Sequence, residues 1–307
     1  MPYRLEPNEP VAAGLKRVVA EEFAWAVDHL SGKQKTGRDA AIHETRKSIK
    51  KIRAVLRLVS CQIGDPWRAE NNRLRKVAHT LAEFRDAAVM IHTFDELKRE
   101  FRDDGWPRTL SSVRSAFRQK ADSETRREIT RILKATIPVL RKTAADAQAW
   151  PLGGDGFAVL EPGLAKAYRR SRKALARARN SAFPEVWHEY RKRVKDHWYH
   201  VRLLGDLGTA TMAEYEKDLK QLETLLGDDH NLVVLHDRIA ADSASYGTEK
   251  DIRFLVDHIG VYQKKLRHGA RSLSDGIYAE KPRRYVRRVR GLWESWRKEH
   301  CAGSIQQ

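Results

Sequence analysis

Apolar residues recur at spacings of three and four along nearly all of this 307-residue chain, and alternating runs of β-branched residues are absent. Ala, Leu, Arg, Lys and Glu, which all favour helices, are abundant. These features predict an all-α fold, with breaks at Gly-, Pro- and Asp-rich segments. Helix starts are expected at Asp65 before Pro66 and at Ser123 with Glu124. We expect helices over residues 10–31, 37–61, 68–84, 86–102, 108–121, 124–149, 161–182, 184–206, 212–226, 231–245, 248–273 and 282–299.

The chain is strongly basic. Its 59 Lys and Arg residues outnumber 41 Asp and Glu residues, which gives a formal net charge of +18. Such a charge favours an anionic partner, namely nucleic acid, an acidic membrane surface or a polyphosphate-type ligand. No run of about 18 apolar residues occurs, so we expect no membrane insertion. The two cysteines, Cys61 and Cys301, form no disulfide framework, and the N-terminus lacks the apolar core of a signal peptide. We therefore expect a cytoplasmic protein.

The stretch "IHETRKSIKKIRAVLRLV", which starts at Ile42, separates its charges from its apolar residues. On a helix, an arc of about 120° holds most of the cations: His43, Arg46, Lys47, Lys50, Arg53 and Arg57. The opposite side holds the apolar residues Ile42, Ile49, Ile52, Val55, Leu56 and Val59. We expect one face to be buried and the other to be cationic. Local pairing is expected to be scarce, because Glu44 can reach Lys47 but few other acids lie nearby.

A second stretch, "WHEYRKRVKDHWYHVRLL" from Trp187, repeats this pattern at an offset of 145 positions. Its cationic face contains His188, Arg191, Lys192, Lys195 and Arg202, and Tyr199 joins that face. At the same offset, "LRKVAHTLAEFRDAAVM" from Leu74 aligns with "LKQLETLLGDDHNLVVL" from Leu219. This register predicts a duplicated helical unit. We expect a first half over residues 1–150 and a second half over residues 151–307, joined through the Gly- and Pro-rich segment 150–163.

Two further segments contain cations and no acid: "KAYRRSRKALARARN" from Lys166 and "KPRRYVRRVRG" from Lys281. Arg169, Arg170 and Lys173 of the first segment join the candidate anion-binding set. An ordinary solvated surface is the alternative interpretation, but such surfaces mix charges of both signs. The two histidines strengthen the binding hypothesis, because an anion would favour imidazolium, which donates hydrogen bonds to anionic oxygens.

Signatures of catalysis and cofactor binding are absent from the sequence. No GxxxxGK[ST] or GxGxxG loop occurs, and the HExxH pattern fails because Lys47 and Lys192 occupy the second histidine position. His197 with His200, and Asp228 to His230, lack convincing further metal ligands. We therefore expect no cofactor, no metal and no enzymatic activity, although a nucleophile assembled only in the folded protein stays open.

The two repeated stretches, the "LAEFRDAAVM" and "LLGDDHNLVVL" segments and "AEKPRRYVRRVRGLW" together resemble the CHAD (conserved histidine α-helical domain) family. The resemblance covers about residues 10–299. It implies two helical-bundle lobes related by an internal repeat, with a basic groove or channel between them. It also implies binding of inorganic polyphosphate and association with polyphosphate granules.

The binding positions that the resemblance carries over are His43, Arg46, Lys50, Arg53 and Arg57, with His188, Arg191, Lys195 and Arg202. The chain departs from the family pattern at Trp198, at Arg202, and at His230-Asn231, which align with Arg85-Asp86 of the first half. The ExExK signature of the triphosphate-tunnel hydrolases that are sometimes fused to this family is missing. No catalytic partner domain is therefore expected on this chain.

The sequence thus favours a non-catalytic polyphosphate-binding protein with no specific nucleic-acid partner. Arg forks and Lys ammonium groups suit the closely spaced phosphates of such a ligand. One alternative is a nucleic-acid-binding protein, which needs accessible aromatic residues or a helix-turn-helix. The other is a metal-dependent phosphoryl-transfer or phosphohydrolase enzyme, which needs a carboxylate cluster.

Overall fold

A computed structural model describes residues 3–83, 86–103, 105–122 and 126–302. These ranges contain helices and no β-strand, so the predicted all-α fold is confirmed. The α-helices are α1 Val11–Leu30, α2 Arg38–Leu58, α3 Ser60–Ile63, α4 Pro66–Glu83, α5 Asp86–Glu100, α6 Ser111–Asp122, α7 Arg126–Gln148, α8 Glu161–Arg179, α9 Pro184–Leu204, α10 Ala210–Ala241, α11 Glu249–Ile277 and α12 Pro282–Ala302. The short 3-10 helices are η1 Arg108–Leu110, η2 Phe157–Val159 and η3 Ser243–Ser245.

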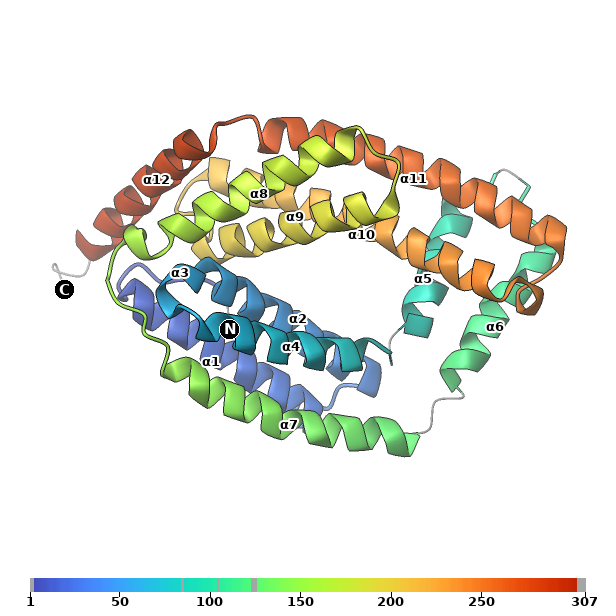
Figure 1. Cartoon of the computed structure of the whole chain (residues 1–307), viewed down its shortest axis with the longest axis horizontal. Helices are drawn as coiled ribbons and strands as arrows, with labels where there is room; N and C mark the ends of the chain where they lie inside the picture. The colour runs from blue at the N-terminus through green and yellow to red at the C-terminus, as the bar shows by residue number, and fades with distance from the viewer. Residues whose placement is uncertain (1–2, 84–85, 104, 123–125, 303–307) are drawn as a thin grey trace.

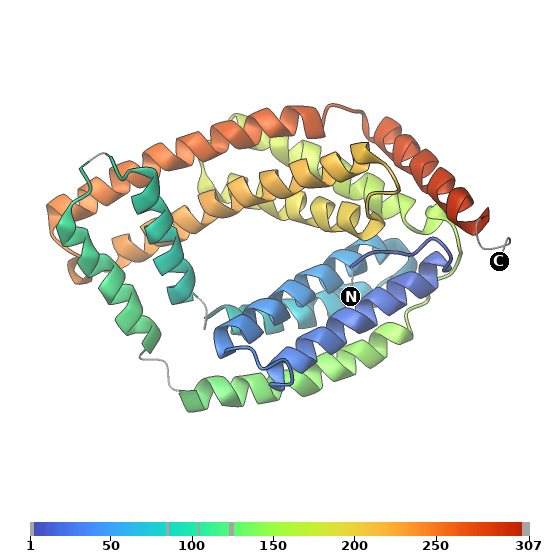
Figure 2. The same ribbon diagram turned by 180° about the vertical axis from the view of Figure 1, so that it is seen from behind.

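The helices form two groups that lie side by side (Figure 1 and Figure 2). In one group, α1 packs against α2 and α7, and α4 packs on α2. In the other, α9 packs between α8 and α10, α11 packs on α10, and α12 packs on α8. In each group, the helix with a cationic stretch, α2 or α9, packs against another helix, α4 or α10. The internal repeat itself stays a prediction.

The two groups share one core where α2 meets α8 and α9. The Nε2 atom of His200 donates a hydrogen bond to the Ala54 carbonyl oxygen at 2.9 Å. At Gly163, any Cβ atom would overlap the Leu58 carbonyl oxygen, so glycine is required for α8 to approach α2 this closely. From this joined end, the ribbons of α2 and α9 diverge (Figure 1). The cationic side chains of both helices lie along this diverging pair.

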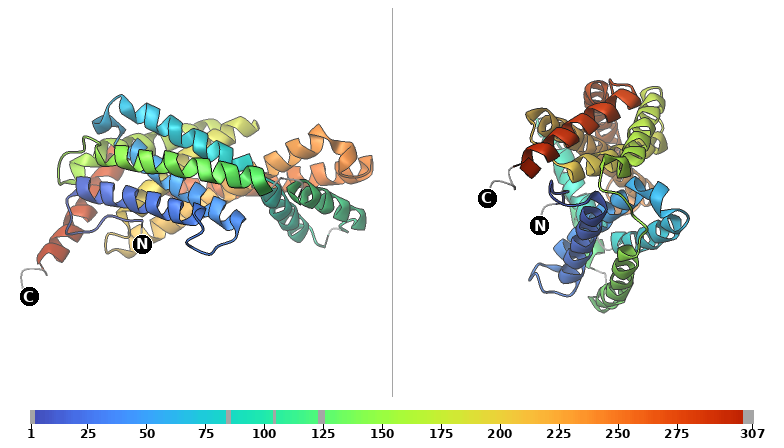
Figure 3. Two further views of the ribbon diagram at one scale, coloured as in Figure 1. Left: turned by 90° about the horizontal axis from the view of Figure 1, so that it is seen from below. Right: turned by 90° about the vertical axis from the view of Figure 1, so that its left-hand side faces the viewer.

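Helices α5 and α6 project from one end of the molecule, beside the far ends of α10 and α11 (Figure 3). A second core cluster holds them there, in which Phe94 and Phe117 pack in the same cluster as Leu235 and Tyr246. The first part of the sequence thus contributes to the packing around α10 and α11. The division of the chain at residue 150 stays a prediction.

Helix α10 differs from the sequence-based expectation. A break was expected between residues 226 and 231, but α10 runs unbroken from Ala210 to Ala241. Gly227 lies inside it, and an interior glycine costs only about 1 kcal/mol relative to alanine. The burial of Leu226 and Leu232 on either side outweighs that cost. The expected helix start at Ser123 and Glu124, and the aligned position Arg85, lie outside the described residues.

Candidate functional site

The apolar face of α2 is buried as predicted, and this orients the cationic face. Ile42, Ile49, Ile52, Val55, Leu56 and Val59 are all at most 1% exposed. On the cationic face of α2, three guanidinium groups donate hydrogen bonds to neutral oxygen atoms of α4. Arg46 Nη1 donates to the Ala78 carbonyl oxygen at 2.5 Å. Asn71 Oδ1 accepts from Arg53 Nε at 3.0 Å and from Arg57 Nη1 at 3.2 Å. These contacts with neutral oxygen atoms fix the direction of the guanidinium groups.

Lys50 marks the point at which cations from α2 and α9 come together. Burial lowers the pKa of its ammonium group well below the usual value, and the neighbouring charges of Lys195, Arg46 and Arg191 lower it further. Glu223 acts in the opposite direction. No carboxylate of the described residues lies within 4.0 Å of the Lys50 ammonium group. Four cations from two helices therefore repel one another around a single acid.

Glu223 of α10 is the counter-ion of the second-half cations. Its Oε1 atom lies 2.5 Å from Lys195 Nζ, and its Oε2 atom lies 2.8 Å from Lys220 Nζ. Burial raises the pKa of this carboxyl group, but the two ammonium groups outweigh that effect and bring the pKa down to about 2. Glu223 is only 5% exposed and is ionised at neutral pH. It already occupies an anion position within the cation cluster.

Arg191 is less well paired than Lys195. Burial lowers the pKa of its guanidinium group, and the charges of Glu223 and Asp228 oppose this shift. Its Nε atom is buried and has no hydrogen-bond partner among the residues that the structure describes. The guanidinium group lies beside Gly227 of α10. Arg191 thus has donor capacity for an anion.

The two candidate histidines have different partners. His188 Nδ1 lies 3.2 Å from His230 Nδ1, and the ring centroids are 4.3 Å apart. One ring donates and the other accepts, so this contact requires at least one neutral imidazole. Burial and the neighbouring cation Arg191 lower both pKa values, that of His230 to about 3. His43 Nε2 instead lies 3.8 Å from Glu44 Oε1. Both lowered pKa values favour neutral imidazole rings in this pair.

Local pairing along α2 is scarce, as expected, but carboxylates of α9 pair with two of the candidate cations. Arg57 Nη2 lies 2.5 Å from Asp196 Oδ1, and Lys192 Nζ lies 2.7 Å from Glu189 Oε2. Only the contact of Lys47 with Glu44, at 3.0 Å, follows from the sequence analysis. Asp196 lies on a different helix from Arg57, so local spacing could not predict that pair, whereas Glu189 has the same spacing to Lys192 as Glu44 has to Lys47. Around Lys50, by contrast, the nearby charges are mostly positive.

On α9, three neighbouring side chains pack together: Trp198, Tyr199 and Arg202. Tyr199 is 3% exposed, and burial raises the pKa of its phenol. Arg202 lies over the Trp198 ring at 5.6 Å from the centroid, and Lys220 lies over the same ring at 4.7 Å. The indole is thus occupied by two cations, and Tyr199 lies within the core rather than on an open cationic surface.

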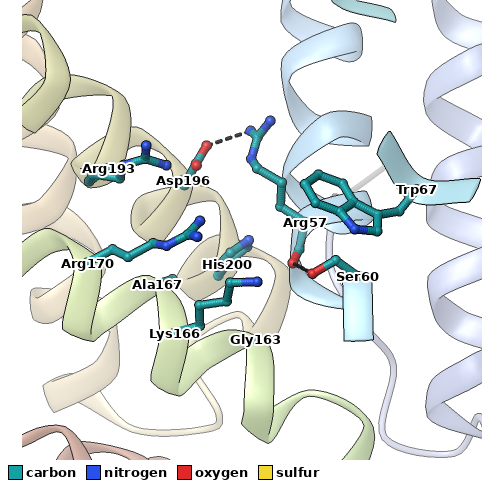
Figure 4. A pocket seen from close by; sticks show the side chains of 10 residues that line it. All are labelled: Arg57, Ser60, Trp67, Gly163, Lys166, Ala167, Arg170, Arg193, Asp196 and His200. Carbon is teal, nitrogen blue, oxygen red and sulfur yellow. Dashed lines mark hydrogen bonds and ion pairs between the residues drawn. The ribbon is translucent and has the colours of Figure 1, made fainter. Parts of the chain in front are cut away.

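The three candidate cations of α8 lie in different surroundings. Arg170 lines a small pocket with Lys166, Arg57, Asp196 and Arg193, shown in Figure 4. That pocket measures about 30 Å³, which is room for one or two water molecules rather than for a phosphate chain. Arg169 lines a separate pocket beside α12, and Lys173 is exposed on α8.

The acid at the centre of the cation cluster, Glu223, was not predicted from the sequence. The predicted offset of 145 contained a signal for it, because the offset aligns Lys195 with Lys50 and Glu223 with Ala78. The second half therefore has a carboxylate where the first half has a methyl group. This single difference explains why Lys195 has an ion-pair partner and Lys50 does not.

The histidines considered as metal ligands have structural roles. His197 hydrogen-bonds to the hydroxyl groups of Tyr278 and Tyr285, at 3.2 and 3.0 Å, and burial lowers its pKa to about 3. Within the described ranges, no group of three or more His, Cys, Asp or Glu residues is placed to hold a metal ion. In the same ranges, no helix combines the length and the apolar character needed to cross a bilayer.

Two solved structures and one protein-family model resemble this chain. The crystal structure of the CHAD domain from the plant Ricinus communis matches with a TM-score of 0.66 and 15% identity, over 92% of this chain and 98% of that one. PptA from Streptomyces chartreusis matches with a TM-score of 0.55 and 14% identity, over 88% of this chain and 98% of that one. A search of curated proteins finds no match. The family model of the CHAD domain matches residues 16–240, most of the sequence, and the chain therefore belongs to the CHAD domain family.

Proposed function

We propose that this protein binds inorganic polyphosphate and catalyses no reaction on it. The observation that carries the proposal is the environment of Lys50, where Arg46, Arg191 and Lys195 act on one half-buried ammonium group. A chain of phosphates would relieve this repulsion, because each repeating unit brings a negative charge and oxygen atoms that accept from Arg and Lys. The polyphosphate association of the CHAD family supports the same conclusion. It also makes attachment to polyphosphate granules the expected location.

The aromatic residues of the site favour polyphosphate over nucleic acid. Binding of single-stranded nucleic acid uses exposed aromatic faces on which bases stack. Here Trp198 is 7% exposed and Tyr199 is 3% exposed, and cations already cover the indole. The site therefore offers charge and hydrogen-bond donors without a stacking surface. A ligand that has phosphates and no bases matches this chemistry.

The state of Glu223 supports a binding role rather than catalysis. A general base works best when its pKa lies near the working pH. The pKa of Glu223 is about 2, because Lys195 and Lys220 hold the carboxylate in its ionised form. Glu223 is thus a poor proton acceptor at neutral pH. Burial raises the pKa of Asp228, whose charge also acts on Arg191, to about 6, so Asp228 is the acid for which the phosphate-release assay is the test.

The test compares Arg46→Gln combined with Arg191→Gln against a control that removes the same charge elsewhere, Lys134→Gln combined with Arg141→Gln. Each charge-assisted contact contributes about 1.5–3 kcal/mol, so the first variant should bind polyphosphate at least tenfold more weakly than the parent. The control should lose far less, and both should keep the helical circular-dichroism spectrum. Equal losses in the two variants would show non-specific attraction and would defeat the site assignment.

Two additional measurements separate the alternatives. Competition between polyphosphate and single-stranded DNA of equal charge should favour polyphosphate, whereas a nucleic-acid-binding protein would hold both equally well. Incubation with polyphosphate and Mg²⁺ or Mn²⁺ should release no phosphate. Phosphate release that disappears in the Arg46→Gln and Arg191→Gln variant would establish an enzyme instead.

A further inference from the structure

A second basic pocket lies on the outer side of the molecule, between α8 and α12. Its volume is about 390 Å³, which is within the range of small-ligand sites. It is lined by Glu161, Ala165, Arg169, Pro282, Arg283, Val286, Arg287 and Arg290. Figure 1 shows α12 beside α8 at the end of the molecule where the chain terminates. We call this feature the outer arginine pocket.

The charges of the outer arginine pocket are unbalanced. Its one acid, Glu161, already pairs with Arg290. Within the described residues, no carboxylate lies within 4.0 Å of the guanidinium groups of Arg169, Arg283 or Arg287, and all three residues are exposed. The first turn of α12 also contains no acid, so its cations lie near the positive end of the helix dipole. Three guanidinium groups are therefore gathered around one cavity without an internal counter-ion.

Helix α8 separates this pocket from the cluster around Lys50. Arg169 and Arg170 are consecutive, so their side chains leave the helix about 100° apart. Arg170 points toward Arg57 and Asp196, in the pocket between the two halves (Figure 4). Arg169 lines the pocket with α12 instead. One helix thus presents cations on two sides, one facing the seam with α2 and the other facing outward.

We propose that the outer arginine pocket is a second phosphate-chain site, which holds a segment of polyphosphate distinct from the segment at the Lys50 cluster. This inference rests on the proposed function for its ligand. An arginine side chain donates two parallel hydrogen bonds to the oxygens of a phosphate, and exposed guanidinium groups need little rearrangement to do so. A long chain bound at the Lys50 cluster would then meet the second site at a high effective concentration. Short chains would gain nothing from it.

The experiment uses the full chain with Arg169→Gln, Arg283→Gln and Arg287→Gln combined. The control variant removes three exposed cations from α7 and α11 by combining Lys134→Gln, Arg141→Gln and Lys264→Gln. Affinity for long-chain polyphosphate is measured over a series of salt concentrations. The outer variant should bind about tenfold more weakly or worse, because the second attachment is lost. The slope of log affinity against log salt concentration should be smaller in magnitude by about 2, because each of the three lost phosphate contacts contributes about 0.7 to that slope.

The Arg46→Gln and Arg191→Gln variant, measured in parallel, keeps the two proposals distinguishable. If the outer variant behaves like its charge-matched control while the Arg46 and Arg191 variant loses binding, the outer site is refuted and the proposed function stands. If the parent does not bind polyphosphate at all, the proposed function fails. If only the outer variant loses binding, the Lys50 cluster is not the site and the outer pocket is.

A single-stranded DNA oligonucleotide tests the other source of linked phosphates. The outer variant should lose affinity for polyphosphate and little for DNA. A loss confined to DNA would assign the pocket to nucleic acid and overturn the inference. Tripolyphosphate provides the length control, since its affinity for the Lys50 cluster should be the same in the outer variant and in the parent.

Discussion

Replacing Glu223 with glutamine should destabilise the free protein by about 3 kcal/mol while making polyphosphate a more effective stabiliser. The carboxyl pKa falls from 4.5 to about 2, despite burial, because Lys195 and Lys220 hold the ionised form. Each pKa unit corresponds to about 1.4 kcal/mol of differential stabilisation, so a shift of about 2.5 units gives about 3 kcal/mol. Glutamine keeps the size of the side chain and removes only the charge.

The pH dependence of this loss follows from the direction of the shift. Because the folded-state pKa lies below the unfolded-state value, the contribution of Glu223 is complete above about pH 4.5. It disappears as the pH falls through about 2, where the carboxyl group is protonated in both states. Urea unfolding at pH 7, pH 4 and pH 3 should therefore show a gap between parent and Glu223→Gln that narrows with acidity. Glu214→Gln, an exposed change on the same helix, should show almost no gap.

Thermal unfolding with polyphosphate tests the second part of the prediction. A ligand at 100 times its dissociation constant stabilises a protein by about 2.7 kcal/mol. At about 2.1 cal/mol/K of unfolding entropy per residue, the Tm of this 307-residue chain should rise by about 4 °C. Glu223→Gln should show a larger rise at equal ligand concentration, because phosphate then takes the place of the carboxylate beside Lys195. A smaller rise, or a variant as stable as the parent at pH 7, would refute the reasoning.

Two further predictions concern protons and packing. Affinity for polyphosphate should increase as the pH falls from 8 to 5. An anion raises the lowered pKa values of His188 and His230, and protonation of Asp228, whose pKa is about 6, removes a negative charge. Binding titrations at each pH should show a weaker trend for His188→Gln, and tighter binding at pH 8 would contradict the proton linkage. In urea unfolding, Gly163→Ala should lower the free energy of unfolding by about 1–3 kcal/mol or more, because the new Cβ atom would overlap the α2 backbone. The control Gly260→Ala places its Cβ atom in open space and should cost nothing. Equal effects of the two changes would contradict the close approach of α8 and α2.

The features that the sequence predicted are those that depend on local spacing. The apolar stripe of α2 is buried from Ile42 to Val59, and Trp187, Val194 and Val201 of α9 are buried in the same way. The spacing of apolar residues with a period of 3.6 can be recognised within one segment, without knowledge of distant residues. The helix break expected near Gly227 was wrong, because a glycine signals a helix end only when tertiary packing does not hold the helix together.

The partners of the cationic side chains could not be predicted in the same way. Asp196 of α9 pairs with Arg57 of α2, and the two residues are 139 positions apart in the chain. Many acids could serve a given lysine, and only the folded backbone selects one. The sequence therefore predicts which side of a helix carries charge, while the structure determines how much of that charge stays unbalanced.

The difference between the two repeated segments has a physical consequence for binding. Glu223 gives the second-half cations an internal counter-ion, which stabilises the fold when no ligand is present. At the aligned position Ala78, the first half has no such group, and within the described residues Lys50 forms no ion pair within 4.0 Å. A carboxylate at both positions would neutralise the site and weaken anion binding, and none at either would leave four close cations to oppose folding. One acid shared by both halves is thus a compromise between the stability of the free protein and its affinity for an anionic chain.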